Sequence, residues 1–194
     1  MTEGRLRWFL LAGVLLGALG LGALRMVTGF GVTPDPTPAP TASPSYPAAW
    51  RAYSPPDGSF RVVAPTPPKE QAASTNAGTL HRVDFPPPGD GAWFVEWLDV
   101  DPTAAAGRTD ADLVDMALST MPDRLGAQID EEDLLKDGPF PGVELQLSDP
   151  AGKVYLIRVF AKDGRLVEAA AELGPGEDRA LAERFVASLE LSLS

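Results

Sequence analysis

The stretch from Ala92 to Val100 reads AWFVEWLDV and decides the class of the fold. Alternate residues of a strand point to opposite faces of a sheet. Each face of this strand therefore carries three large apolar side chains: Trp93, Val95 and Trp97 on one face, and Phe94, Leu98 and Val100 on the other. A strand that is apolar on both faces is typical of a sheet that is covered on both sides. We therefore expect a central strand between two structural layers.

Further strands are predicted on both sides of this segment and are separated by turn sequences. Pro55-Pro56-Asp57-Gly58 places an Asp-Gly turn between two short strand patterns, and Asp163-Gly164 places a tighter turn between two longer ones. With a short last strand at the C-terminus, the predicted ranges are 50–53, 59–64, 78–85, 143–147, 154–161, 166–172 and 189–193. The acidic segment before residue 143 is predicted to be a loop.

Two helices are predicted between and after these strands. Thr109 fits the N-cap of the first helix, because two aspartates follow it in the first turn. Pro122 should kink or end this helix near Thr120, because proline lacks a backbone N–H. The second helix is predicted over 177–188. Strands, helix, strands and helix in this order predict an α+β fold with an antiparallel sheet.

The first 32 residues are predicted to be a membrane-targeting segment. Arg5 and Arg7 precede an uncharged run of 17 residues over 8–24. At 1.5 Å per residue this run spans about 25 Å, which is short of a hydrocarbon core of about 30 Å. Arg25 can extend its charged head to the interface, which lengthens the usable span to Phe30. A lipoprotein anchor is excluded because the chain contains no Cys.

A retained signal anchor and a cleaved secretory peptide both fit this segment. The uncharged run exceeds the usual upper limit of about 15 residues for a secretory peptide, which favours the anchor. Ala18 and Gly20 are small residues that would suit a cleavage site, which favours the peptide. Because Arg5 and Arg7 precede the span, the N-terminus should stay cytoplasmic. We expect a single-pass membrane protein with an extracytoplasmic C-terminal domain, and a secreted form is the alternative.

A proline-rich linker and one folded domain follow. Residues 33–47 read TPDPTPAPTASPSYP, which favours an extended polyproline stalk. The domain is expected over 48–194, which is 147 residues and a common domain size. Of the 16 Lys and Arg and 27 Asp and Glu residues, three basic and two acidic ones precede it, so its net charge is −12. That charge disfavours nucleic acid and anionic lipid as partners.

The composition excludes several kinds of catalytic and metal site. Without Cys there is no disulfide, thiolate metal site or cysteine nucleophile, and a single His excludes a multi-histidine site. A triad of His81 with Ser74 and Asp84 lacks the Gly-x-Ser-x-Gly turn, so His81 is expected to be an ordinary strand residue. We expect no catalytic residues, no cofactor and no bound metal.

Acidic residues supply the remaining candidates. Asp99-Val100-Asp101 and Asp110-Ala111-Asp112 resemble fragments of a calcium site, but the glycine and glutamate that an EF-hand needs are missing. Gly174-Pro175-Gly176 could hold an anion at a helix start, although the two acids after it would repel one. One run contains four consecutive acids: Asp130, Glu131, Glu132 and Asp133. It is either a solvated loop or strand edge, or a surface that recognises a basic partner. We take this run as the candidate partner surface.

Three stretches of the domain resemble the PsbP-like fold family. The first runs from Tyr53 to Val62 and continues with Pro65 and Pro67-Pro68-Lys69. The second runs from Phe140 to Leu145 and is followed by Asp149-Pro150-Ala151-Gly152 and Arg158-Val159-Phe160. The third begins with Gly164-Arg165-Leu166 and ends with Glu183 to Leu189. The resemblance implies an antiparallel sheet flanked by helices and a binding or assembly module rather than an enzyme. The matching residues are turn glycines, strand edges and a helix stripe, so no binding site is transferred with them.

We therefore expect a non-catalytic protein-binding or assembly module in the cell envelope. Small-ligand binding or transport support through a groove beside the sheet is the alternative, followed by a hydrolase that uses acidic residues. A closed core with one exposed patch would favour the module, and a roomy apolar cavity would favour the ligand carrier. A deep pocket with convergent carboxylates would favour the enzyme.

Overall fold

The computed structural model describes residues 50–75, 78–87, 89–136 and 138–192. The predicted membrane segment over 1–32 and the predicted linker over 33–47 lie outside the described residues. Within the described ranges, no helix combines the length and the apolar character needed to cross a membrane.

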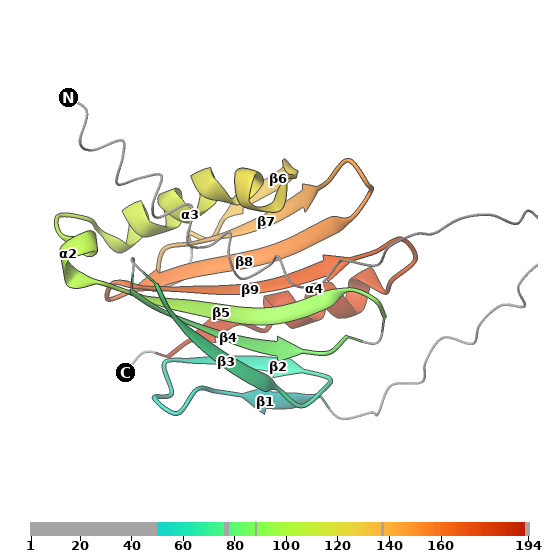
Figure 1. Cartoon of the computed structure of the whole chain (residues 1–194), viewed down its shortest axis with the longest axis horizontal. Helices are drawn as coiled ribbons and strands as arrows, with labels where there is room; N and C mark the ends of the chain where they lie inside the picture. Colours follow the sequence, from blue (N-terminus) through green and yellow to red (C-terminus); the bar gives the residue numbers. More distant parts are fainter. Residues whose placement is uncertain (1–49, 76–77, 88, 137, 193–194) are drawn as a thin grey trace, which may run out of the picture.

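Seven antiparallel strands form the main sheet, and β5 lies near its middle (Figure 1). In spatial order they are β3 (Lys69–Thr75), β4 (Gly78–Phe85), β5 (Ala92–Val100), β9 (Arg165–Leu173), β8 (Val154–Lys162), β7 (Gly142–Ser148) and β6 (Gln128–Leu134). A small second sheet has the order β1 (Arg51–Tyr53), β2 (Phe60–Ala64) and β10 (Glu190–Leu191). The helices are α2 (Pro102–Ala105), α3 (Asp110–Leu125) and α4 (Arg179–Ala187). The α+β class with an antiparallel sheet is therefore confirmed.

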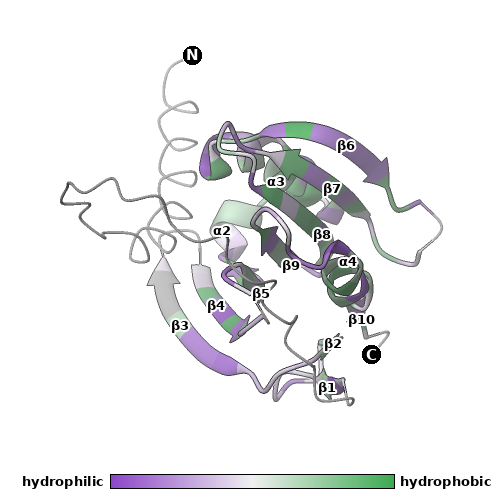
Figure 2. Cartoon of the chain, turned by 90° about the vertical axis from the view of Figure 1, so that its right-hand side faces the viewer, coloured by the Kyte–Doolittle hydropathy of each residue, from purple (hydrophilic) through white to green (hydrophobic). Residues whose placement is uncertain are grey.

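Both faces of β5 are covered, as the alternating pattern predicted. On the face that we call the α4 face, Trp93 and Trp97 pack in one core with Phe60 of β2 and Phe185 of α4. On the opposite, α3 face, Phe94 belongs to a second core with residues of α3 such as Leu113. Figure 2 shows α3 and α4 on opposite sides of the sheet. The sheet is thus flanked by helices, with β2 adding to the layer on the α4 face.

Helix α3 begins as predicted and ends later than predicted. Thr109 and Asp112 form a reciprocal capping box, in which the Asp112 carboxylate accepts from the Thr109 backbone N–H at 2.7 Å. The helix does not end near Thr120 but continues through Pro122 and stops at Gly126, which adopts a left-handed conformation with φ 61°. Pro122 removes only one hydrogen bond in the last turn, and the fully buried Met121 holds that turn against the sheet.

Two strands were not predicted, and one of them corrects the assignment of the acidic run. The expected acidic loop is strand β6, which pairs with β7 from Gln128 to Leu134 apart from a bulge between Ile129 and Glu131. Strand β3 pairs along its whole length with β4, although its sequence KEQAAST is mostly polar. Pairing with a neighbouring strand overrides weak local preference in both segments. The other predicted strands are confirmed, with shifts of one or two residues at some ends.

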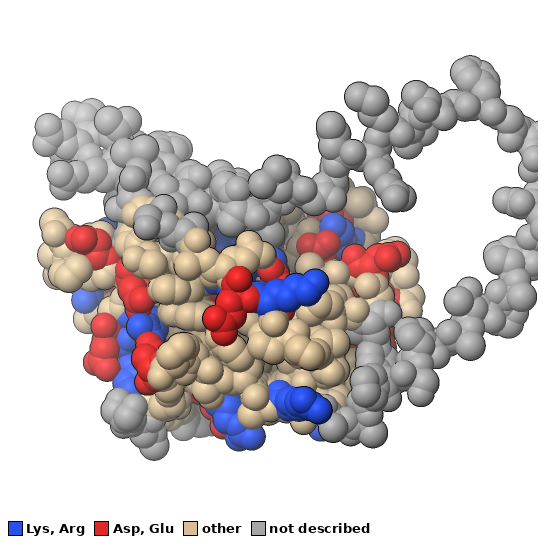
Figure 3. All heavy atoms as spheres, turned by 60° about the horizontal axis from the view of Figure 1, so that its bottom comes forward, with Lys and Arg blue, Asp and Glu red and all other residues tan. Residues whose placement is uncertain are grey.

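Basic side chains do not form one continuous patch on the face shown in Figure 3. The Lys and Arg residues described there are separated by other side chains, and several lie beside Asp or Glu. Together with the net charge of −11 for the chain, this distribution leaves no continuous surface for a polyanion on that face.

Candidate functional site

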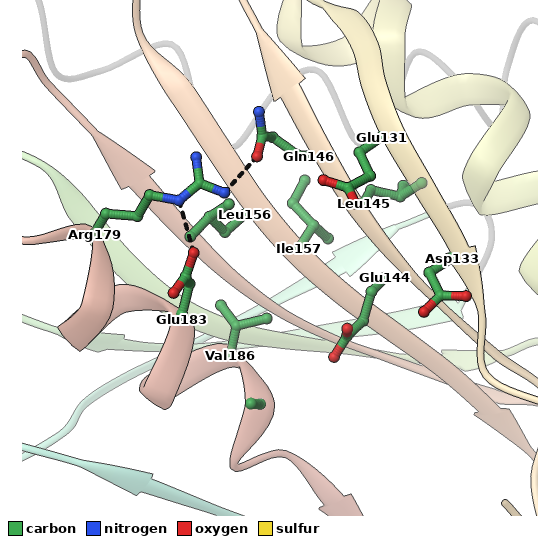
Figure 4. A pocket seen from close by; sticks show the side chains of 11 residues that line it. Glu131, Asp133, Glu144, Leu145, Gln146, Leu156, Ile157, Arg179, Glu183 and Val186 are labelled. Atoms are coloured by element: carbon green, nitrogen blue, oxygen red, sulfur yellow. Dashed lines mark hydrogen bonds and ion pairs between the residues drawn. The ribbon is translucent and has the colours of Figure 1, made fainter. Parts of the chain in front are cut away.

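A pocket of about 260 Å³ opens on the α4 face between α4 and the strands β6, β7 and β8. Buried apolar side chains contribute to its floor, among them Leu156 of β8 and Val186 of α4. Four carboxylates lie around it: Glu131 and Asp133 of β6, Glu144 of β7 and Glu183 of α4 (Figure 4). We call this feature the acidic pocket.

The pairing of β6 with β7 brings two acids of the predicted run to the acidic pocket. Glu131 pairs with Gln146, and Asp133 pairs with Glu144. Directly opposed residues of antiparallel strands share a face of the sheet. All four residues therefore face α4, and all four line the pocket.

The other two acids of the run do not reach the pocket. Glu132 pairs with Leu145, which belongs to the core beneath α3, so Glu132 lies on the α3 face. Asp130 lies at the bulge and accepts a hydrogen bond from the Ser148 hydroxyl at 3.1 Å. The run predicted as one partner surface is thus divided, and only Glu131 and Asp133 belong to the site.

Two arginines neutralise two of the four carboxylates of the pocket, Glu144 and Glu183. Arg158 of β8 donates to Glu144 from Nε at 2.6 Å and from Nη2 at 2.5 Å. Arg179 of α4 donates to Glu183 Oε1 at 2.7 Å and to Gln146 Oε1 at 2.5 Å. Figure 4 shows Arg179 held between these two side chains at one side of the pocket. Within the part of the chain that the structure describes, neither Glu131 nor Asp133 forms an ion pair.

The acidic pocket combines uncompensated negative charge with an apolar floor. Lys and Arg have apolar stems that pack on such surfaces while their charged ends reach a carboxylate. The arrangement therefore fits a basic side chain. Local sequence could not identify it, because Glu144, Arg158, Arg179 and Glu183 come from three elements that only the fold brings together.

His81 and Asp84, which were considered for a catalytic triad, do not come together in the structure. His81 stacks on Trp97 with ring centroids 4.8 Å apart, and its Nε2 lies 3.6 Å from an oxygen of Asp99. Asp84 lies on the opposite face of β4 from His81 and pairs with Arg82 at 2.7 Å. His81 is therefore a strand residue stacked on a core tryptophan.

The aspartates considered for calcium each have a separate structural role. Asp99 pairs with Arg165, and Asp101 caps α2. Asp110 accepts hydrogen bonds from the backbone of the β8–β9 turn, and Asp112 belongs to the cap of α3. The described residues contain no group of three or more His, Asp or Glu side chains arranged to hold a metal ion. At the loop that begins with Gly174, the Glu177 carboxylate accepts hydrogen bonds from the backbone N–H groups of Gly91 and Gly174. These donors therefore bind a side chain of the domain itself and not an external anion.

A buried group of charges on the α3 face was missed by the sequence analysis. Glu96 and Glu168 are opposite each other on β5 and β9 and are 6% and 4% exposed. Arg82 donates to Glu96 at 2.8 Å, and Arg124 of α3 donates to Glu168 at 2.5 Å. Burial and the neighbouring Glu168 raise the pKa of Glu96, whereas the two arginines oppose that shift. The Arg82–Glu96 pair joins two strands, and the Arg124–Glu168 pair holds the end of α3 against the sheet.

Comparison with known proteins identifies the fold and no closer relationship. No protein-family model matches the sequence, and no curated protein shows a similar sequence. The solution structure of cyanobacterial PsbP (CyanoP) from Synechocystis sp. PCC 6803 superimposes with a TM-score of 0.53 at 13% identity and covers 88% of this chain and 100% of CyanoP. A crystal structure from Bacteroides thetaiotaomicron VPI-5482 gives a TM-score of 0.40 at 16% identity and covers 74% of this chain and 48% of that protein. The fold is PsbP-like, which confirms the resemblance, and identities this low show the fold alone.

Proposed function

We propose that the domain is a non-catalytic protein-binding module that recognises a basic partner protein in the cell envelope. The observation that carries this proposal is the acidic pocket, where Glu131 and Asp133 lie unpaired above an apolar floor. Both acids are exposed. A partner's Lys or Arg could pair with them without breaking an ion pair within the domain.

The size and surroundings of the pocket favour a protein over a small ligand. Its volume of about 260 Å³ is at the low end for a small-molecule site. Strand β6, which forms one side of the pocket, also exposes two apolar side chains on its other, α3 face: Ile129 is 36% and Leu134 is 44% exposed. The strand thus presents apolar groups on one face and uncompensated charge on the other, and a partner protein that covers its edge can contact both.

The same geometry gives little support to the hydrolase alternative. A glycosidase-type mechanism needs one carboxylic acid that an apolar environment keeps protonated beside an ionised partner. The four carboxylates of the pocket lie on exposed or half-buried residues, and Arg158 and Arg179 hold two of them. We therefore propose that the domain does not catalyse a reaction.

We also propose that the first 32 residues hold the chain at the membrane, with the domain outside the cytoplasm. The support is the uncharged run over 8–24 after Arg5 and Arg7, followed by the proline-rich stretch over 33–47. This arrangement would present the acidic pocket to other envelope proteins. A secreted domain remains the alternative.

Site-specific crosslinking of the full-length protein in its native cells tests the proposed function. A photo-crosslinking residue at Ala187, which is exposed and lines the pocket without supplying a carboxylate, should give one discrete protein adduct, which mass spectrometry then identifies. The same residue at Asp123, exposed on α3 at the other face of the sheet, should give none. Equal labelling from both sites, or none from position 187, would argue against a partner at the acidic pocket.

Neutralising the acids then tests the recognition chemistry with the identified partner. The variant Glu131→Gln with Asp133→Asn should weaken binding and flatten its dependence on salt, because two uncompensated charges are removed. The matched control Glu132→Gln removes a charge from the same strand but on the α3 face. Replacing all four acids of the run should add little beyond the pair. Unchanged affinity in the pair variant contradicts the proposal.

A further inference from the structure

Strand β6 is an edge strand whose outer side is open. It is the last strand in the order of the main sheet, and no other strand of the described chain pairs with its outer side. All seven of its residues are exposed. Figure 2 shows β6 at the rim of the molecule, beside the layer that contains α4. An exposed edge of this length is a template on which another extended chain can pair.

The pairing register identifies which backbone groups of β6 are free. The Leu135 N–H donates to the Gly142 carbonyl at 3.0 Å, just beyond the end of β6. In an antiparallel ladder every second residue bonds to the same neighbour. Asp133 and Glu131 therefore bond to β7, whereas the N–H and C=O groups of Glu132 and Leu134 point away from the sheet.

The charges of β6 determine which chain could pair there. If two copies paired through β6, their acids would come close together, and like charges on adjacent strands are destabilising. A strand carrying Lys or Arg would meet the acids with the opposite charge. Its side chains on the α4 face would follow one another at about 7 Å along the strand, over Glu131 and Asp133 at the rim of the acidic pocket.

We propose that an extended partner segment with Lys or Arg at alternate positions adds to the outer edge of β6 as an eighth strand of the main sheet. The backbone groups of Glu132 and Leu134 supply the hydrogen bonds, and Glu131 and Asp133 select the basic side chains. This inference rests on the proposed function and specifies how the partner is held. Acidic residues on an edge strand also prevent aggregation, and if that were their only role, no strand would bind.

Amide hydrogen exchange, read residue by residue by NMR on the full-length protein in detergent, tests the inference. The probe is a seven-residue capped peptide in which Lys alternates with Thr, and the control peptide has the same composition with its lysines adjacent. At about ten times its dissociation constant, the alternating peptide should slow exchange of the Glu132 and Leu134 amides about tenfold. The amides of Glu131 and Asp133 already bond to β7 and should change little. Unchanged exchange at Glu132 and Leu134 overturns the inference.

A proline substitution separates strand addition from attraction between side chains. Glu132→Pro removes an outward N–H without removing a bond to β7, whereas Glu132→Ala removes the same charge and keeps the N–H. Glu132→Pro should bind the alternating peptide about tenfold more weakly than Glu132→Ala, because one hydrogen bond is lost and a peptide carbonyl is left unpaired. Equal affinities of the two variants would contradict strand addition.

A modified peptide gives the same test without changing the protein. N-methyl groups at the peptide positions that face β6 should abolish protection, whereas N-methyl groups at the intervening positions should not. If both methylated peptides bind alike and the variant Glu131→Gln with Asp133→Asn still weakens the partner, strand addition is wrong and the proposed function stands. If that variant has no effect on the partner either, the proposed function fails as well.

Discussion

Arg124 shows how a single charge can hold an element in place. It reaches from the last turn of α3 to Glu168 at 2.5 Å, and its Nη1 lies 4.0 Å from Glu96. Both acids are buried within the sheet. Removing one partner of a buried ion pair leaves the other charged and unpaired, which costs far more than the pair contributes.

Arg124→Met should therefore destabilise the domain by about 3–5 kcal/mol. The free energy of unfolding is measured by denaturation in urea. The double variant Arg124→Met with Glu168→Met should recover much of that loss, because it removes the unpaired carboxylate. If the double variant is no more stable than the single one, the loss comes from packing and not from charge.

Glu96 should make the stability of the domain depend on pH. Burial and Glu168 raise its pKa above the ordinary value of 4.5. An acid whose pKa is higher in the folded chain stabilises the fold fully below its unfolded pKa, and this contribution is lost as pH rises through the folded pKa. In Glu96→Gln, stability should therefore decline less than in the wild type as pH rises above 4.5, as measured by thermal unfolding at a series of pH values.

Asp57 supplies a control of opposite sign. Burial opposes its ionisation, yet hydrogen bonds from Arg165 and from the Ser59 backbone lower its pKa to about 2. Its contribution is present above the ordinary pKa of 3.8 and is lost as pH falls from 3.8 toward 2. Asp57→Asn should lower stability by a constant amount above pH 3.8 and change the pH dependence of stability only in this acid range. If Glu96→Gln and Asp57→Asn altered the pH dependence of stability over the same range, the assignment to Glu96 would be wrong.

At the scale of elements, Pro122 is a weak point in α3. It lies inside the helix and removes the bond that its N–H would make to the preceding turn. Pro122→Ala should stabilise the domain by about 1 kcal/mol, less than the cost in a helix interior because only the last turn is affected. Urea denaturation measures the gain, and helical circular dichroism should rise slightly. A loss of stability would mean that proline stabilises mainly by restricting the unfolded chain.

The elements predicted with most success are those whose own residues determine them. Strands β4 and β5 match their predicted ranges at both ends, because three prolines directly follow β4 and large apolar side chains occupy both faces of β5. Thr109 was recognised as a cap because its partners are adjacent in sequence. Strands β3 and β6 were missed because neither has an apolar face, and only pairing with β4 or β7 makes them strands.

The same distinction explains how much of the site could be predicted. The acids of β6 were identified as a candidate surface, and alternation along a strand places Glu131 and Asp133 together, but which face of the sheet they occupy depends on the bulge before Glu131. An uninterrupted alternation would have placed Ile129 on the same face as Glu131, whereas Ile129 pairs with Leu147 on the α3 face. The buried Glu96 and Glu168 did leave a signal, because each interrupts a run of apolar residues within its strand. A charge at such a position predicts a buried partner, here an arginine.

At the scale of the whole molecule, the acidic pocket and the open edge of β6 meet at one strand. Glu131 and Asp133 line the pocket, while the residues between and after them direct their backbone groups outward. One bound segment could therefore use side-chain and backbone contacts together. Such a combination would give specificity through charge and affinity through the added hydrogen bonds.

The proposed membrane anchor makes a prediction about the whole chain. If the segment over 8–30 stays in the bilayer, the intact mass of the protein from native membranes should still include it. The protein should also resist extraction with alkaline carbonate, because a spanning helix is held by its apolar surface and not by charge. A variant that begins at Ala48 should be released by the same treatment.

A mature chain beginning near Leu21 would instead identify a cleaved peptide. The domain would then reach its partner by diffusion, and binding through the acidic pocket would have to be strong enough without the local concentration that an anchor provides.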